Sequence, residues 1–138
     1  MSDLAPTAAN VMQVSGPPPG VAVAGVDLVG GQMIYLDKTD SSKAKLADCD
    51  ASAATKEAVG MVICASAKAG QHVTYAKPGA VVAMGNILTA GSFYALSDVA
   101  GAVRPVADNG SGDGAVLVGA AISGTQMKLH LWNSGATV

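Results

Sequence analysis

The chain has 138 residues and a formal net charge of −2, and half of its residues are apolar although only 13% are charged and 4% aromatic. It contains no cluster of Lys and Arg, so the electrostatic attraction that drives nucleic-acid binding is weak, and no apolar run reaches the roughly 18 residues of a membrane-spanning helix. Two cysteines, Cys49 and Cys64, are too few for a disulfide framework. We therefore expect one domain that binds neither nucleic acid nor membrane, with a charge-poor surface covered in part by partner subunits.

Residues 1–20 differ from the rest of the chain, because they show no hydrophobic period and end in three prolines and a glycine. Prolines fix φ and favour an extended polyproline conformation. We expect an extended N-terminal arm over 1–20, without the basic region of a signal peptide, followed by a β domain over 21–138. A frayed terminus is the alternative. The arm residues expected to bind a partner are Val11, Met12, Val14, Pro17, Pro18 and Pro19.

From Val21 onward the sequence is a series of short apolar runs, each ended by Gly, Pro, Asp, Asn or Ser, which is typical of strands and turns. The expected strands lie within 21–28, 31–37, 58–67, 70–79, 80–91, 91–98, 101–108, 115–123 and 125–132. Many short strands at this spacing favour a small β-barrel or β-sandwich. The loop 38–58 is long. Within it, 50–58 is a candidate helix with Asp50 or Ser52 as its cap, and a wide loop with one helical turn is the alternative.

The strand pattern occurs twice. The segment GQMIYLD matches the later segment GSFYALS, a Val-Gly pair follows each of them at Gly60 and Gly119, and an alternating strand then ends each copy. We therefore expect two similar halves, about 27–76 and 87–132, since neither could bury its apolar face alone. The paired glycines are expected to admit a close neighbour or a bulge.

The sequence lacks the residue patterns of an enzyme. His72 and His130 lie within expected strands, and no GxSxG nucleophile elbow occurs. Asp48 and Asp50 begin a stretch that departs from the calcium-loop pattern at its required Gly and Glu. The Gly- and Asp-rich segment 108–118 is a single copy, whereas calcium-binding repeats of that kind stack. We expect no enzymatic activity, no cofactor and no metal.

One long segment resembles a known family. The sequence GNILTAGSFYALSDVAGAVRPVAD, followed by VLVGAAISGTQMKLHL, combines an LTAG turn, a tyrosine-bearing strand ending in Leu-Ser, an AG turn, and a VG-x-A-x-S-x-T strand and turn. This combination resembles structural proteins of tailed bacteriophages, in particular capsid decoration proteins, also called cement proteins. The resemblance covers about 85–132 well, the first half more loosely, and the arm not at all.

The resemblance implies a small β-barrel or β-sandwich that assembles, often as a homotrimer, on the outer capsid surface of the virion. There it would bridge subunits of the major capsid protein and resist the pressure of packaged DNA. The arm would lie along the capsid or a neighbouring subunit. Trp132, together with Leu131, is a candidate oligomer interface because Trp is enriched among interface hot spots, and a core Trp is the alternative.

Two other functions remain open at this point. Related modules occur in head fibres and tail fibres, which would bind a host receptor or a glycan, although few aromatic residues are present for stacking on sugars. A secreted bacterial β domain is the third candidate, against which the missing signal peptide counts. Tyr35, Phe93 and Tyr94 are expected to be core or barrel-rim residues.

Overall fold

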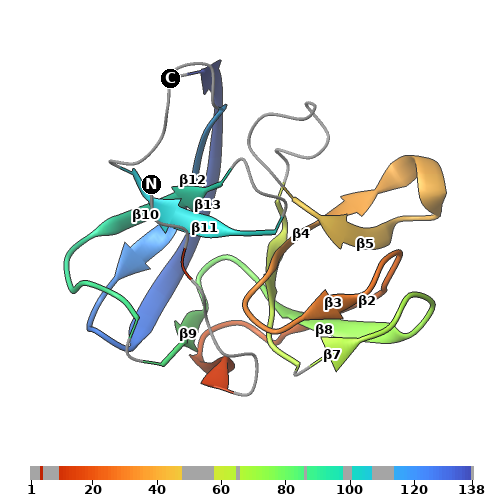
Figure 1. Ribbon diagram of the computed structural model, residues 1–138, viewed down its shortest axis with the longest axis horizontal. Coiled ribbons are helices and arrows are strands. Elements are labelled where there is room, and N and C mark those ends of the chain that lie inside the picture. The colour runs from red at the N-terminus through yellow and green to blue at the C-terminus, as the bar shows by residue number, and fades with distance from the viewer. Residues whose placement is uncertain are drawn as a thin grey trace.

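The computed structural model describes residues 4, 10–47, 58–64, 66–85, 87–97, 101–106 and 114–137. These residues form an all-β fold, as the sequence predicts (Figure 1). Outside the described residues lie Cys49, the Asp48 and Asp50 stretch, most of the expected helical turn within 50–58, and the part of the Gly- and Asp-rich segment before 114.

The strands form two large antiparallel sheets and one small one. The six-stranded sheet consists, in spatial order, of β1 (Met12–Ser15), β9 (Val81–Ala83), β13 (Gln126–Thr137), β12 (Gly114–Ala121), β10 (Phe93–Leu96) and β11 (Val103–Pro105). The five-stranded sheet consists of β2 (Gly20–Val23), β8 (His72–Ala76), β6 (Gly60–Val62), β4 (Met33–Asp37) and β5 (Lys43–Leu46). The small sheet pairs β3 (Leu28–Val29) with β7 (Ser66–Ala67). In the described residues the sheets do not close into a barrel.

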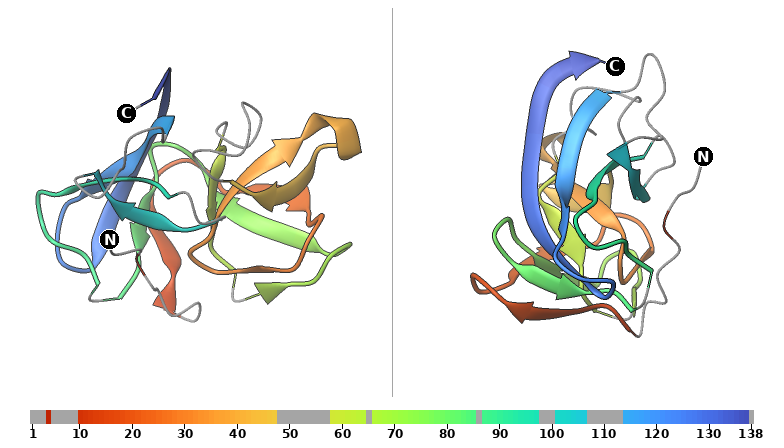
Figure 2. Two further views of the ribbon diagram at one scale, coloured as in Figure 1. Left: turned by 45° about the horizontal axis from the view of Figure 1, so that its top comes forward. Right: turned by 90° about the vertical axis from the view of Figure 1, so that its left-hand side faces the viewer.

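The expected duplication is present in the topology. In spatial order, β2-β8-β6-β4-β5 of the first half corresponds strand for strand to β9-β13-β12-β10-β11 of the second half. The same five positions are also reached in the same order along the chain. Figure 2 shows the two halves as neighbouring lobes, with β12 and β13 as the two long curved strands of the second lobe.

Registers and turns repeat with the strands. The cross-strand pair Ile34–Gly60 of the first half is equivalent to the pair Tyr94–Gly119 of the second. In the same way, Ala22–Val73 is equivalent to Val82–Met127. The Gly31 amide donates to the Val62 carbonyl at 2.8 Å, and the Gly91 amide donates to the Ala121 carbonyl at 2.9 Å. Both glycines have a positive φ, 93° and 82°, which side chains rarely adopt. The two halves are therefore copies of one structural unit at the level of individual hydrogen bonds.

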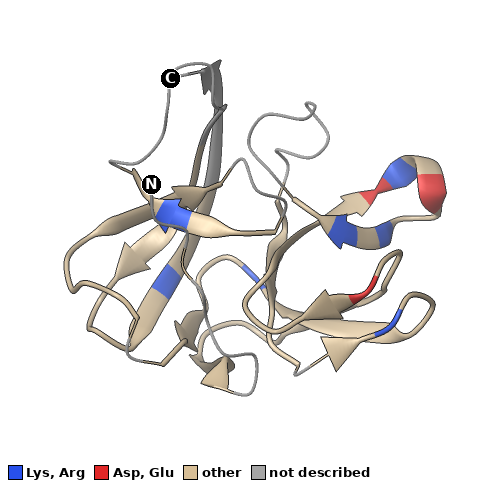
Figure 3. Cartoon of the chain, viewed as in Figure 1, with Lys and Arg blue, Asp and Glu red and all other residues tan. Residues whose placement is uncertain are grey.

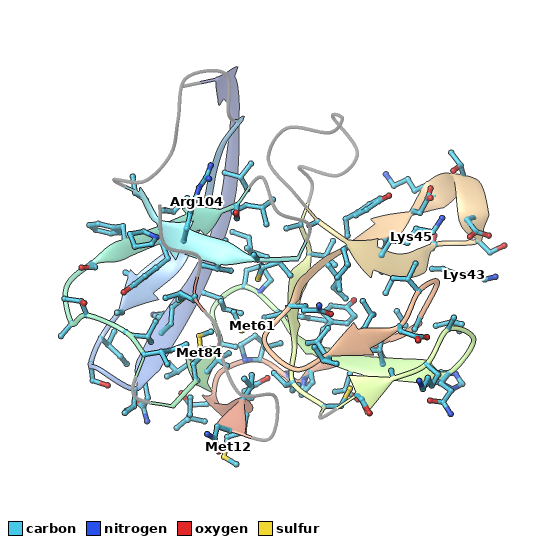
Figure 4. The ribbon with its side chains drawn as sticks, viewed as in Figure 1. Met12, Lys43, Lys45, Met61, Met84 and Arg104 are labelled. Atoms are coloured by element: carbon cyan, nitrogen blue, oxygen red, sulfur yellow. The ribbon has the colours of Figure 1, made fainter. Side chains whose placement is uncertain are left out.

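Two apolar cores follow from the alternation of side chains along the five-stranded sheet. Met33 and Met61 point to one side and join residues of the six-stranded sheet in what we call the inter-sheet core. Met61 is labelled there in Figure 4. Ile34 and Val62 point to the other side, into an inner core that the small sheet covers with Leu28. The five-stranded sheet is thus buried on both faces, and the six-stranded sheet on the face that carries Tyr94, Leu96, Val118, Met127 and Leu129.

The expected arm over 1–20 is corrected by the structure from Asn10 onward. Strand β1 pairs with β9 at the edge of the six-stranded sheet, and Val11 is 3% exposed within the inter-sheet core. The alternation of inward Val11 and Gln13 with outward Met12 was too short to stand out in the sequence. Residues 10–20 therefore belong to the domain.

The expected loop over 38–58 is also corrected in its first part. Lys43–Leu46 forms β5, which pairs with β4, and Ala44 is fully buried in the inner core. The segment is a strand because its lysines alternate with apolar residues that face the core, although lysine is depleted in strands generally. A 3-10 turn, η2 (Lys38–Asp40), joins the two strands.

Candidate binding surface

The described side chains hold no cluster of three or more His, Cys, Asp or Glu that could bind a metal ion. His72 on β8 and His130 on β13 are both exposed and belong to different sheets. Among the described residues no helix is long and apolar enough to cross a membrane.

A charged hairpin, residues 37–45, lies at the tip of β4 and β5 (Figure 3). The Lys45 Nζ is 2.8 Å from Asp37 Oδ2 and 3.2 Å from Asp40 Oδ2. The hydrogen bond from Lys45, followed by those from the Thr39 hydroxyl and amide, lowers the pKa of Asp37 to about 2. The two carboxylates in turn raise the pKa of Lys45. This network holds the tip of the hairpin together and marks a polar end of the molecule.

The opposite part of the molecule exposes the outer face of the six-stranded sheet, which is the face turned away from the inter-sheet core. Directly paired residues of antiparallel strands project to the same side of a sheet. One row across this outer face consists of Met12, Ala83, Gln126 and Ile122. The next row consists of Ser15, Val81, Lys128, Ala120 and Phe93.

Large apolar side chains stand out on this outer face. Met12 is 57% exposed, Phe93 59% and Ile122 55%, whereas their chain neighbours Tyr94 and Ala121 are buried in the inter-sheet core. Met12 projects away from the body at the edge of the sheet (Figure 4). Phe93 was expected in the core or at a rim, and its exposure is what sequence reasoning missed.

The duplication identifies the counterpart of the outer face in the first half. Phe93 corresponds to Met33, and Ala120 corresponds to Met61, since each pair occupies the same place in the repeated registers. Met33 and Met61 are fully buried against the second half. The same strand positions are thus buried in the first half, whereas in the second half Phe93 is exposed and Ala120 is half-buried.

The other expected binding residues are divided between surface and core. Met12 and Val14 are exposed, Val11 is buried, and Pro17, Pro18 and Pro19 form the link from β1 to β2. The Gln13 side chain donates to the Pro17 carbonyl at 2.8 Å and ties this link to β1.

Near the C-terminus, Leu131 is half-buried against the inter-sheet core, so the structure places it at the edge of the core as well as near the surface. Trp132 lies on β13 opposite Leu117. Its side chain is outside the described part of the structure, and its expected interface role stays a prediction.

The chain matches no protein-family model, and no curated protein matches it.

Proposed function

We propose that this protein is a virion structural protein that binds the outer surface of a bacteriophage capsid and stabilises the shell by bridging subunits of the major capsid protein. The observation that carries the proposal is the distribution of the described side chains: the charged network lies on the β4–β5 hairpin of the first half, and most of the exposed large apolar side chains lie on or beside the six-stranded sheet. The resemblance of residues 85–132 to capsid decoration proteins supports the same function.

Of the large apolar side chains that are exposed in the described residues, Val21 and Val29 lie in the first half, and the others lie on or beside the six-stranded sheet: Met12, Val14, Phe93, Val106 and Ile122. Along the strands of that sheet the charged residues are Arg104, which is buried, and Lys128. Most of the exposed large apolar side chains of the described residues thus belong to one sheet and its edges, and exposed apolar surface is a feature of protein interaction sites.

A decoration protein needs no chemistry, because it acts by binding alone. Binding to the assembled shell stabilises that shell relative to its separated subunits, by an amount that grows with occupancy. A homotrimer would contact several capsid subunits at once, and the linked contacts would raise the total affinity above that of a single one. We propose this arrangement for the protein.

The test is a binding experiment with purified capsids that lack the protein. We expect saturable co-sedimentation at a fixed ratio to the major capsid protein, together with a higher temperature of capsid disruption. Failure to bind capsids would contradict the proposal. Binding to host cells or glycans, with label at the tail tip in electron micrographs, would instead support a head-fibre or tail-fibre module.

A further inference from the structure

We propose that the outer edge of β11 is a binding site for an extended peptide segment, and that the N-terminus of the chain itself occupies this site through Leu4. The ligand is a backbone strand with a branched apolar side chain, the class of ligand that strand edges bind. The contact opens and closes while the rest of the domain stays folded. The site is independent of the proposed function.

The first half shows how the repeated unit satisfies the equivalent edge, which is the outer edge of β5. The chain that leaves β2 reaches this edge, where Ala24 forms a parallel bridge with Ala44. The Gly25 amide donates to the Ala44 carbonyl at 2.8 Å. In the first half, the donor to the edge therefore comes from within the repeated unit.

The equivalent acceptor in the second half is the Val103 carbonyl. On β5, Ala44 pairs with Leu36 of β4. On β11, Val103 pairs with Leu96 of β10, which takes the place of Leu36 in the repeated register. The donor to the Val103 carbonyl is the Leu4 amide, at 2.7 Å. A residue from the N-terminus thus makes the hydrogen bond that Gly25 makes in the first half.

The second half differs from the first where its chain leaves β9. Met84 follows β9 as Ala24 follows β2, and each donates its amide to the residue that precedes the paired strand, β13 or β8. A glycine comes next in both halves, but Gly85 has a φ of 77° whereas the φ of Gly25 is not positive. This left-handed residue turns the chain away from the course that Gly25 follows. The Asn10 side chain lies beside it, 3.6 Å from where a Cβ atom of Gly85 would be.

The Leu4 side chain adds an apolar contact to the hydrogen bond. Leu4 is half-buried and packs against the inter-sheet core, to which Val103 also belongs. In sites for extended peptides, main-chain hydrogen bonds provide affinity and the places that receive side chains provide specificity. The edge of β11 and the adjoining core combine both kinds of contact.

The described contact of Leu4 is small compared with the contacts of the core strands. It consists of a backbone hydrogen bond and a half-buried side chain. Leu129 of β13, in contrast, is fully buried, and its amide and carbonyl are both bonded to the chain between β8 and β9. Segments with few buried contacts open locally, at a free energy far below that of global unfolding. We therefore expect the Leu4 contact to open by itself.

The experiment measures amide hydrogen exchange of the full chain by NMR at several low denaturant concentrations. The Leu4 amide is expected to exchange about 10- to 100-fold more slowly than in an unstructured peptide, at a rate that denaturant does not change. The Leu129 amide is expected to be slowed at least about 1000-fold and to accelerate with denaturant, because its exchange requires global unfolding.

Two variants of the full chain test the side chain. Leu4→Asp is expected to remove the protection of the amide at position 4 and to leave that of Leu129 unchanged. Met12→Asp is the matched control, because Met12 is 57% exposed, and it should leave the protection of Leu4 intact.

A synthetic peptide of residues 1–9 tests the binding site itself. At millimolar concentration, which matches the effective concentration of a short tether, it should shift the NMR signal of Val103 in the Leu4→Asp variant. The same peptide with Leu4→Asp should not. A Val103 signal that neither peptide shifts would refute the binding site.

The exchange data on the wild type are decisive in the same way. A Leu4 amide that is unprotected, or that exchanges together with the core amides, would overturn the inference. Protection of Leu4 that rises with protein concentration would place the N-terminus on a second copy and would also overturn it.

Discussion

Two glycines at equivalent places in the two halves allow neighbouring strands to approach closely. A Cβ atom on Gly60 would overlap the carbonyl oxygen of Ala76, and one on Gly119 would overlap that of Lys128. The atoms in the way are backbone, which cannot rotate aside as a side chain could. Glycine is therefore required at these positions because there is no room for a Cβ atom, and not because of the backbone conformation.

We expect Gly60→Ala and Gly119→Ala each to lower the free energy of unfolding by about 1–3 kcal/mol, the usual cost of overpacking. Urea denaturation of each variant measures this. Gly91 provides the contrast, because it has a φ of 82° and open space around it. There Asn, which tolerates a positive φ, should be better accepted than Ala, whereas at Gly119 the larger Asn should be worse than Ala. The opposite ranking at Gly119 would refute the steric explanation, and the opposite ranking at Gly91 would refute the conformational one.

Asp37 is the residue whose ionisation matters most in the charged hairpin. Its pKa is lowered from 3.8 to about 2 by Lys45 and Thr39, so the folded state binds this proton less readily than the unfolded chain does. The contribution to stability is therefore present above the ordinary pKa and is lost as the pH falls through the lowered one. Because the side chains are partly solvated, the effect is modest and is screened by salt.

Asp37→Asn should accordingly flatten the loss of stability on acidification. We expect the melting temperature of the wild type to fall more steeply than that of the variant between pH 4 and 2, which is roughly the interval between the two pKa values of Asp37. The difference should shrink when the series is repeated in high salt. Parallel pH profiles for both proteins would show that the Asp37–Lys45 ion pair does not contribute to stability.

At the scale of elements, β1 decides where the domain begins. It is a short edge strand with an irregular register at Val14, and proline follows it. Such features discourage further strands from pairing with the edge. Its inward residue Val11 nevertheless lies in the inter-sheet core, so β1 contributes to stability as well as to the outer face through Met12.

Alanine substitutions distinguish an integral strand from a free arm. Val11→Ala should cost about 2 kcal/mol, because it removes two buried methyl groups. Val14→Ala, at a side chain that is 51% exposed, should stay within about 0.5 kcal/mol of the wild type. Chemical denaturation of both variants measures these changes in the free energy of unfolding. Equal, negligible effects would mean that β1 is not docked in solution.

At the scale of the whole molecule, the inter-sheet core joins the two halves. Met61 of the first half and Met84 of the second lie together in the interior between the sheets (Figure 4). Each half has its own sheet, but neither half covers both faces of the five-stranded sheet by itself. We therefore expect the halves to unfold together.

Unfolding should be a single transition by every probe. The fluorescence of Trp132, the single tryptophan and a reporter of the second half, should give the same denaturation midpoint as far-UV circular dichroism. Met61→Ala should shift both midpoints equally, with a loss of about 2–5 kcal/mol. The exposed Val21→Ala serves as control. Two separated midpoints would show that the halves are independent.

Much of the architecture was predictable from local patterns. The all-β class, most strand positions and the duplication depend on alternation, turn residues and the repeated Val-Gly pair, all of which are properties of short segments. β1 and β5 were not predicted, because Gln13 and the lysines of β5 mask their alternation. The candidate site was predicted only in part, through Met12 and Val14.

What the sequence by itself determined is the repeated unit, since each half contains the same turns, glycines and strand order. Only the tertiary structure decided which copy of the equivalent face is covered. Met33 and Phe93 occupy the same place in the same unit, yet one is fully buried and the other mostly exposed. A local pattern specifies that a strand has an apolar face. Whether that face is buried depends on which element packs against it, and among the described residues only the first copy is fully covered.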